Sequence, residues 1–149
     1  MGIFDFRDPN KRKKKAITIT VECNLKEIYI NNSLISFPTN YNTIKNILGE
    51  ATRIEPIKQT KNNVYLWDEL GIYCSSNDPE KMLMLLLVED IRYGLGHQPL
   101  KNFKGNVLVD GEPIDKTIGN VDLDRPYMIR SIIKDKNRVA IAIGWNPGV

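Results

Sequence analysis

The stretch Val64-Tyr-Leu-Trp-Asp-Glu-Leu-Gly-Ile-Tyr-Cys74, near the middle of the chain, decides the fold. Its two halves, 64–67 and 71–74, are rich in the aromatic and β-branched residues that favour strands. Asp68 and Gly71 favour a turn between them, because aspartate bonds to nearby backbone groups and glycine accepts a positive φ. We therefore predict a β-hairpin at the centre of the fold.

The segments on both sides of this hairpin also predict short strands joined by tight turns. Apolar and polar residues alternate in 16–23, so Ile19 and Val21 share one face of a strand. Asn31-Asn32 and Asp110-Gly111 are pairs that accept the positive φ of two-residue hairpin turns. The further strands that these patterns predict are 26–30, 33–37, 52–57, 82–88, 106–109, 112–114, 127–134 and 138–143.

One short helix is predicted between the strands, over residues 43–49. This segment places three apolar side chains on one face, with Thr43 or Asn42 at the N-cap and Gly49 at the C-terminal cap. A helix of about two turns is marginal alone and must pack on the sheet. The expected fold class is α+β: a mostly antiparallel sheet of about eight to ten short strands in hairpins, sandwich-like or strongly curved, with one or two short helices.

Length and charge divide the chain into an arm and a domain. A chain of 149 residues with 42% apolar and 26% charged residues is typical of one globular domain. Residues 1–15 carry six basic and two acidic side chains, whereas residues 16–149 carry 15 basic and 16 acidic ones. We therefore expect a flexible basic N-terminal arm, 1–15, and a single β-rich domain, 16–149. The basic block of the arm is Lys11, Arg12, Lys13, Lys14 and Lys15.

The sequence also predicts the compartment. No apolar run approaches the roughly 18 residues that a transmembrane helix needs. The first fifteen residues place apolar before basic residues, which is the reverse of the order in a signal peptide. Cys23 and Cys74 are too few for a secreted disulfide framework. We expect a cytoplasmic protein whose two thiols are reduced and partly buried.

Asp68 and Glu69 are the candidates for acid and base chemistry. Adjacent residues of an extended chain point to opposite sides, so they form no facing carboxylate pair unless the turn redirects one of them. His97 is the single histidine, and with two distant cysteines it gives no zinc site. These patterns favour Asp68 as a turn former, Glu69 as a solvated charge and His97 as a surface residue. They predict no enzyme activity, no cofactor and no metal.

The aromatic residues of the hairpin have two possible roles. Tyr65 and Trp67 share one face of their strand, which is turned either into the core or outward as a contact patch. Aromatic side chains with one polar end are common in binding hot spots. The residues that we predict to contact a partner protein are Tyr65, Trp67, Asp68, Glu69 and Tyr73.

Several motifs of the chain together suggest a family. They are Leu48-Gly49, a Y-x-W-D-E-x-G-I core at 65–72, Phe103-x-Gly105 followed by alternating apolar residues, and Asp110-Gly111. Over residues 21–118 the chain resembles a family of uncharacterised bacterial domains with this core motif. The resemblance implies a small accessory or immunity-type protein encoded near toxin systems, and it implies no catalytic residue.

The expected function is that of a non-enzymatic cytosolic domain that binds a partner protein. The resemblance implies one form of this function, an immunity protein that neutralises a cognate bacterial toxin by direct binding. The alternative is a membrane-surface or nucleic-acid accessory protein that acts through the basic block of the arm. A third hypothesis, from another class, is an enzyme that uses Asp68 or Glu69 with His97.

Overall fold

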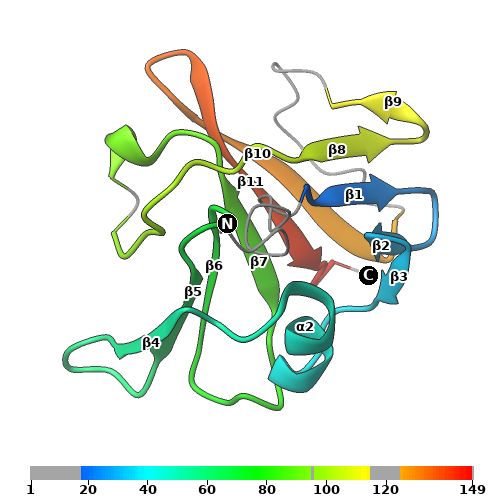
Figure 1. The fold of residues 1–149 in the computed structure, drawn as a ribbon. Helices are drawn as coiled ribbons and strands as arrows, with labels where there is room; N and C mark the ends of the chain where they lie inside the picture. Colours follow the sequence, from blue (N-terminus) through cyan, green and yellow to red (C-terminus); the bar gives the residue numbers. More distant parts are fainter. Residues whose placement is uncertain (1–17, 95, 115–124, 149) are drawn as a thin grey trace, which may run out of the picture.

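The computed structural model describes residues 18–94, 96–114 and 125–148, which form two β-sheets and one α-helix (Figure 1). The elements are β1(Thr20–Cys23), β2(Ile28–Ile30), β3(Ser33–Ile35), α2(Tyr41–Leu48), β4(Arg53–Pro56), β5(Asn63–Trp67), β6(Ile72–Ser76), β7(Met84–Val88), the 3-10 helix η1(Ile91–Tyr93), β8(Asn106–Val109), β9(Glu112–Pro113), β10(Tyr127–Lys134) and β11(Asn137–Trp145). The predicted arm, 1–15, and the predicted start of the domain at residue 16 lie outside the described residues.

The larger sheet has six strands in the order β10-β11-β7-β6-β5-β4, and all its neighbours are antiparallel. Its central hairpin, β5 and β6, is built as predicted, with Trp67 opposite Ile72. Gly71 has a φ of +72°, and its N–H donates to the Trp67 carbonyl at 3.1 Å, which closes the turn. The turn at residues 68–71 therefore lies at one end of the hairpin, where it meets other segments of the chain.

The smaller sheet has five strands in the order β3-β2-β1-β8-β9. Both predicted two-residue turns are confirmed: Asn31 and Asn32 have φ values of 49° and 67°, and Asp110 and Gly111 have values of 53° and 84°. Strand β1 pairs antiparallel with β2 but parallel with β8. This parallel pair departs from the hairpin pattern expected from the sequence. It arises because the chain from β2 to β7 intervenes before β8 returns to the free side of β1.

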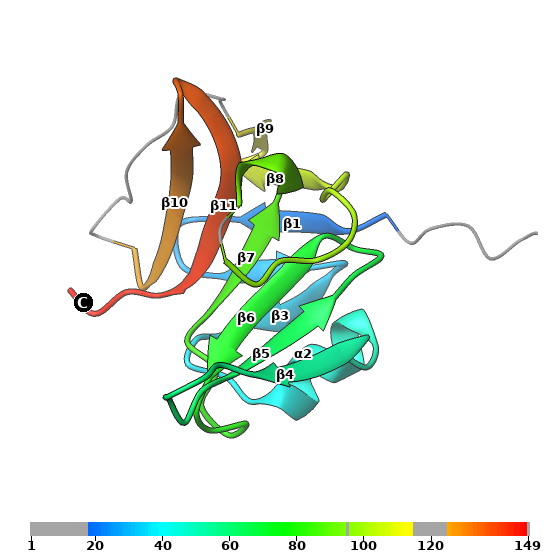
Figure 2. The ribbon, with the colours of Figure 1, turned by 90° about the vertical axis from the view of Figure 1, so that its left-hand side faces the viewer.

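The inner faces of the two sheets share one hydrophobic core. Ile19 and Val21 are 2% and 0% exposed, which confirms the face predicted from their alternation. They belong to the same buried cluster as Leu85 of β7 and Ile141 of β11, in the larger sheet. Figure 2 shows the smaller sheet behind the larger one, with α2 near the lower edge of both. The architecture is thus mostly antiparallel and β-rich, with the core between two sheets.

Helix α2 begins earlier than predicted. Its N-cap is Asn40 rather than Thr43 or Asn42, and the Asn40 side chain accepts a hydrogen bond from the Thr43 N–H at 2.8 Å. The sequence around this point contains several residues that cap helices well, so local preference did not distinguish them. The predicted C-terminal cap is confirmed: Gly49 has a φ of +90°, and its N–H donates to the Lys45 carbonyl at 2.8 Å. No helix within the described ranges has the length and apolarity needed to cross a membrane.

The strand count and the long segment before β8 also differ in detail from the prediction. The described chain has eleven strands, one more than the upper end of the predicted range. Each of the eleven strands nevertheless overlaps one of the segments that the sequence predicts, including the two-residue strand β9 within 112–114. The segment 91–104, for which the sequence predicts no strand or helix, contains the short 3-10 helix η1.

Candidate functional site

The central hairpin turns its aromatic face into the molecule. Tyr65 is 5% exposed and Trp67 is 2% exposed. The ring centroid of Tyr41, on α2, lies 5.2 Å from that of Tyr65 and 6.3 Å from that of Trp67. The indole N–H of Trp67 donates to the Gly49 carbonyl at 2.8 Å, which satisfies its polar atom. Of the two roles that the sequence left open for this pair, the structure supports the core.

Asp68 joins the hairpin turn to β4 and to the loop before β8, and it is 2% exposed. Its carboxylate accepts hydrogen bonds from Arg53 Nε at 2.8 Å, from Arg53 Nη2 at 3.1 Å and from the Leu100 N–H at 3.1 Å. Its own N–H donates to Thr52 Oγ1 at 3.0 Å, and its carbonyl accepts from the Lys101 N–H at 3.1 Å. Each polar atom of Asp68 therefore has a partner, and its carboxylate holds the turn together.

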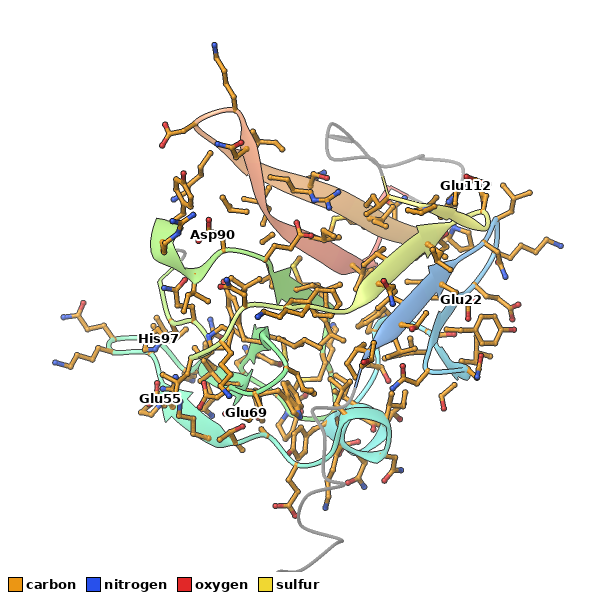
Figure 3. All side chains as sticks on the ribbon, turned by 45° about the horizontal axis from the view of Figure 1, so that its top comes forward. Glu22, Glu55, Glu69, Asp90, His97 and Glu112 are labelled. Atoms are coloured by element: carbon orange, nitrogen blue, oxygen red, sulfur yellow. The ribbon has the colours of Figure 1, made fainter. Side chains whose placement is uncertain are left out.

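Arg53 balances this buried charge. Its guanidinium also pairs with Glu55 at 2.7 Å and donates to the Gln98 carbonyl at 3.2 Å. The hydrogen bonds to Asp68 and Glu55 raise the pKa of Arg53 above its ordinary value, and the same guanidinium lowers the pKa of Glu55. His97 Nδ1 lies 3.5 Å from the Glu55 carboxylate, and Figure 3 shows these two labelled side chains close together. In the described part of the chain no hydrogen bond or ion pair joins His97 to Asp68 or Glu69.

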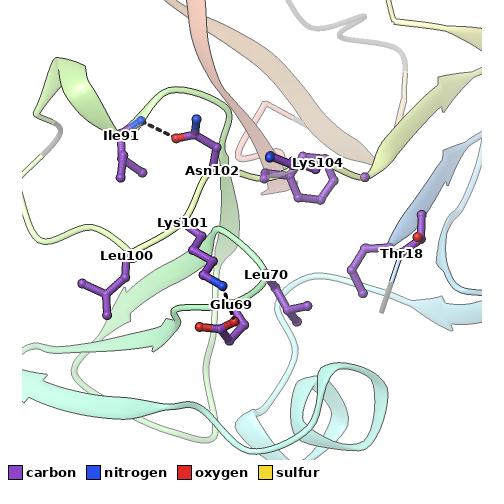
Figure 4. A pocket seen from close by; sticks show the side chains of 11 residues that line it. Thr18, Glu69, Leu70, Ile91, Leu100, Lys101, Asn102 and Lys104 are labelled. Atoms are coloured by element: carbon purple, nitrogen blue, oxygen red, sulfur yellow. Dashed lines mark hydrogen bonds and ion pairs between the residues drawn. The ribbon is translucent and has the colours of Figure 1, made fainter. Parts of the chain in front are cut away.

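Glu69 points to solvent, away from its buried neighbour Asp68. This confirms the prediction that adjacency separates the two carboxylates. The Glu69 carboxylate pairs with Lys101 Nζ at 2.8 Å, and the two side chains are 68% and 61% exposed (Figure 4). A pair so exposed contributes little to stability, because water solvates both charges. Either charge is therefore available to a partner at small cost.

Two glycines allow close backbone packing, Gly71 between the two motif elements and Gly105 against the residue before β1. A Cβ on Gly71 would lie 2.2 Å from the backbone nitrogen of Phe103, and a Cβ on Gly105 would lie 2.1 Å from the Ile19 carbonyl oxygen. The Phe103 N–H donates to the Val88 carbonyl at 2.6 Å, and its side chain is 6% exposed. The hairpin turn and the element Phe103-x-Gly105 thus form one structural unit, although they are far apart in the sequence.

A surface pocket of about 440 Å³ opens where these two elements meet (Figure 4). Its lining combines apolar side chains, such as Leu70, with the charged side chains of Glu69 and Lys101. Asn102 anchors the loop that forms one wall, because its side-chain oxygen accepts a hydrogen bond from the Ile91 N–H at 2.9 Å. The remaining lining residues are Thr18, Ile19, Ile91, Leu100, Phe103, Lys104 and Gly105.

The structure separates the five residues predicted to contact a partner. Four of them are buried, and Glu69 alone among the five lies on the surface. Tyr73 is 8% exposed and packs with Val64 and Leu66 in a second cluster, on the outer face of the sheet. Burial raises the pKa of both Tyr65 and Tyr73. These four side chains therefore lie in the interior of the domain, and of the five residues only Glu69 lines the pocket beside the hairpin turn.

The exposed residues of the site that sequence reasoning missed are Thr18, which precedes β1, and three residues of the loop before β8. The three loop residues are Leu100, Lys101 and Lys104. Leu100 is 66% exposed. The sequence does not indicate this exposure, because a leucine in a loop can be either buried or exposed. A usable signal was present: these loop residues flank the Phe103-x-Gly105 motif, whose glycine requires a close backbone contact.

The two cysteines and the acidic residues give no nucleophile or metal centre in the described chain. Cys23 and Cys74 are both free and buried, and burial raises the pKa of each thiol to about 12. A protonated thiol is a poor nucleophile, so neither cysteine is reactive near neutral pH. Within the described ranges, no three histidine, cysteine, aspartate or glutamate side chains are grouped so that they could hold a metal ion.

Comparison with known proteins identifies the family. No curated protein matches the chain. A solved structure of a cysteine-rich secretory protein from Staphylococcus aureus subsp. aureus Mu50 is similar with 11% identity and a TM-score of 0.38, and the match covers 74% of this chain but only 44% of that one. The profile of DUF7738, a domain of unknown function, matches residues 20–124, a span that includes both motif elements. The chain therefore belongs to the DUF7738 family.

Proposed function

We propose that this chain is a non-enzymatic protein-binding domain of the cytoplasm, and that its partner contacts the pocket beside the hairpin turn. One observation carries the proposal: the hairpin turn, through Glu69 and Leu70, and the segment 100–105 together line a pocket whose rim presents Glu69, Leu100 and Lys101 to solvent. The buried residues of the hairpin motif stabilise the fold, and its exposed residue, Glu69, can contact a partner.

The rim is ordered before any partner arrives. The backbone N–H groups of Leu100 and Lys101 are both bonded to Asp68, so the loop is tied to the turn at two successive residues. Phe103 is tied to the neighbouring strand through Val88. A surface fixed in this way loses little conformational entropy on binding, which favours affinity.

The chemistry of the rim suits a protein partner. Leu100 offers a large apolar side chain that is 66% exposed, and the Glu69–Lys101 pair beside the pocket offers one charge of each sign. Protein interfaces commonly combine an apolar anchor at the centre with charged groups at the rim. The mixed charges favour a partner surface that carries both acidic and basic groups.

We propose further that the partner is a toxin and that the chain is its immunity protein. The support is the resemblance of the Y-x-W-D-E-x-G-I core at 65–72 and of the Phe103-x-Gly105 element to immunity-type bacterial domains. An immunity protein acts by occupying its toxin, which requires a preformed surface but no catalytic group. The pocket at the hairpin turn offers such a preformed surface.

The test is co-expression with the product of the adjacent gene, followed by purification of the complex and measurement of host growth. We expect the parent chain to co-purify with that product and to restore growth. Leu100→Arg removes the apolar anchor and should weaken binding at least 30-fold, the effect of losing a hot-spot residue worth about 2 kcal/mol.

The matched control is Leu25→Arg, because Leu25 is also 66% exposed but lies between β1 and β2. It should leave binding and growth unchanged. Equal binding by the Leu100→Arg variant and the parent would refute the proposed surface. Failure of the parent to bind the neighbouring product or to restore growth would refute the immunity function.

A second candidate function is contact with anionic membranes or nucleic acid through the basic block Lys11 to Lys15. The observation that favours it is the presence of two lysines, Lys101 and Lys104, in the lining of the pocket that also includes Thr18. A further block of five basic residues three positions earlier in the sequence adds positive charge that attracts polyanions. Deleting residues 1–15 should abolish binding to phosphatidylserine vesicles or to an RNA oligonucleotide, while binding to the partner protein persists. If the shortened chain binds the vesicles and the RNA as the parent does, this function is rejected.

A further inference from the structure

A second hollow lies at the other end of the larger sheet, and it belongs to neither motif element. Its volume is about 460 Å³, and it is lined by residues at the start of β7, on β10 and at the end of β11. Figure 2 shows β10 beside β11, with the C-terminal end of the described chain near the start of β10. We call this hollow the methionine pocket, after Met84 and Met128 in its lining.

The register of the sheet explains the shape of the methionine pocket. Met128 on β10, Gly144 on β11 and Met84 on β7 pair in one row across three strands. Gly144 has no side chain, and a Cβ there would lie 2.5 Å from the Met84 Cβ and 2.3 Å from the Leu83 carbonyl oxygen. The row therefore presents two flexible thioether side chains on either side of a bare backbone position.

The wall of the methionine pocket is aromatic and apolar. Trp145, the last residue of β11, is 40% exposed, although tryptophan side chains are highly buried on average. Leu83 and Pro147 complete the apolar lining. Methionine side chains adapt to ligands of irregular shape, and an exposed tryptophan offers a broad apolar surface.

Arg130 supplies the charge of the methionine pocket. It stands two residues after Met128 on β10, so both side chains point to the same face of the sheet. Arg130 is exposed, and within the described part of the chain it has neither a hydrogen-bond nor an ion-pair partner. A guanidinium without a carboxylate beside an apolar hollow is complementary to an anion that carries an apolar body.

We propose that the methionine pocket binds a small carboxylate with an aliphatic body, whose carboxylate pairs with Arg130 and whose chain lies on Met84, Met128 and Trp145. The pocket volume falls within the usual range for small-molecule sites, about 300–1,000 Å³. Such sites are lined mostly by apolar side chains and by a few polar groups, as this pocket is. This site is separate from the pocket at the hairpin turn and does not depend on the proposed protein partner.

The test uses decanoate and decanol as probes, with the fluorescence of Trp145 as the signal. We expect decanoate to change the emission in a saturable way, and Trp145→Phe to remove this change. Decanol, which has the same chain without the charge, should bind about tenfold more weakly, the effect of losing one charge-assisted hydrogen bond at an exposed site.

Arg130→Gln should weaken decanoate binding about tenfold and leave decanol binding unchanged. Arg92→Gln is the matched control, because Arg92 is an exposed arginine on η1, where it pairs with Asp90. It should change neither affinity. Equal affinities of the parent for decanoate and decanol, or an Arg130→Gln variant with parental decanoate affinity, would overturn the proposal. Tighter binding of a peptide with a free C-terminal leucine than of decanoate would overturn the small-molecule assignment.

Discussion

Replacing Asp68 with asparagine distinguishes a structural carboxylate from a catalytic one. The carboxylate accepts three hydrogen bonds, two from Arg53 and one from the Leu100 N–H. The amide keeps a single acceptor oxygen, so at least one charge-assisted bond of about 1.5–3 kcal/mol is lost together with the ion pair. The Arg53 side chain is 33% exposed and keeps Glu55, which limits the net loss in the free energy of unfolding to about 2–3 kcal/mol.

Urea denaturation followed by circular dichroism measures this loss. Arg53→Met leaves a carboxylate that is 2% exposed without its cation, so it should cost more, about 3–5 kcal/mol. The double variant should cost less than the sum of the two, because the residues act through one shared contact. If the free energy of unfolding of Asp68→Asn lies within about 0.5 kcal/mol of that of the parent, the structural role is refuted and Asp68 is again a candidate catalytic residue.

Two further predictions concern backbone contact and burial. Gly71→Ala should lower the free energy of unfolding by about 3 kcal/mol or more, because the new Cβ would clash with the Phe103 backbone at a position whose φ is +72°. Gly94→Ala is the control and should cost about 1 kcal/mol, because Gly94 has a φ of +58° but no atom within 4 Å of the added Cβ. Equal losses for the two variants in urea denaturation would contradict this prediction. Burial raises the pKa of Cys74 from 9.0 to about 12. As the pH rises above 9, the thiol therefore loses its proton in the unfolded chain before it does so in the folded one, which favours unfolding. The free energy of unfolding should fall by about 1.4 kcal/mol from pH 8 to pH 10. Cys74→Ala should lack this part of the fall, and an identical pH dependence in both proteins would disprove the assignment.

The parts of the fold that were predicted from the sequence are those that local chemistry decides. The turns at Asn31-Asn32 and Asp110-Gly111 require a positive φ that these residues tolerate, and both formed as expected. Ile19 follows a strict alternation that assigns its face. The parallel pairing of β1 with β8 has no such local signal, because it depends on how the long intervening chain packs.

The candidate site was harder to predict for a related reason. Periodicity shows that Tyr65 and Trp67 share a face, but the direction of that face depends on Tyr41 in a separate helix. Turn preference recognised Asp68 as a turn residue, but its burial depends on Arg53 in a neighbouring strand. The residues that contact solvent at the pocket, such as Leu100, have no periodicity of their own, and their only signal in the sequence is their position beside Phe103-x-Gly105.

The position of β1 in the middle of the smaller sheet has a consequence for the order of folding. Strands β1 to β3 leave the ribosome first and pair with one another through local hairpins, but the second edge of β1 has no partner until residues 106–109 are synthesised. Pairing over so long a separation is slow, and an open strand edge can pair with other chains in the meantime. A nascent chain that stalls before Asn106 would therefore expose a strand edge open to aggregation, which makes β8 the segment that covers the second edge of β1 during synthesis.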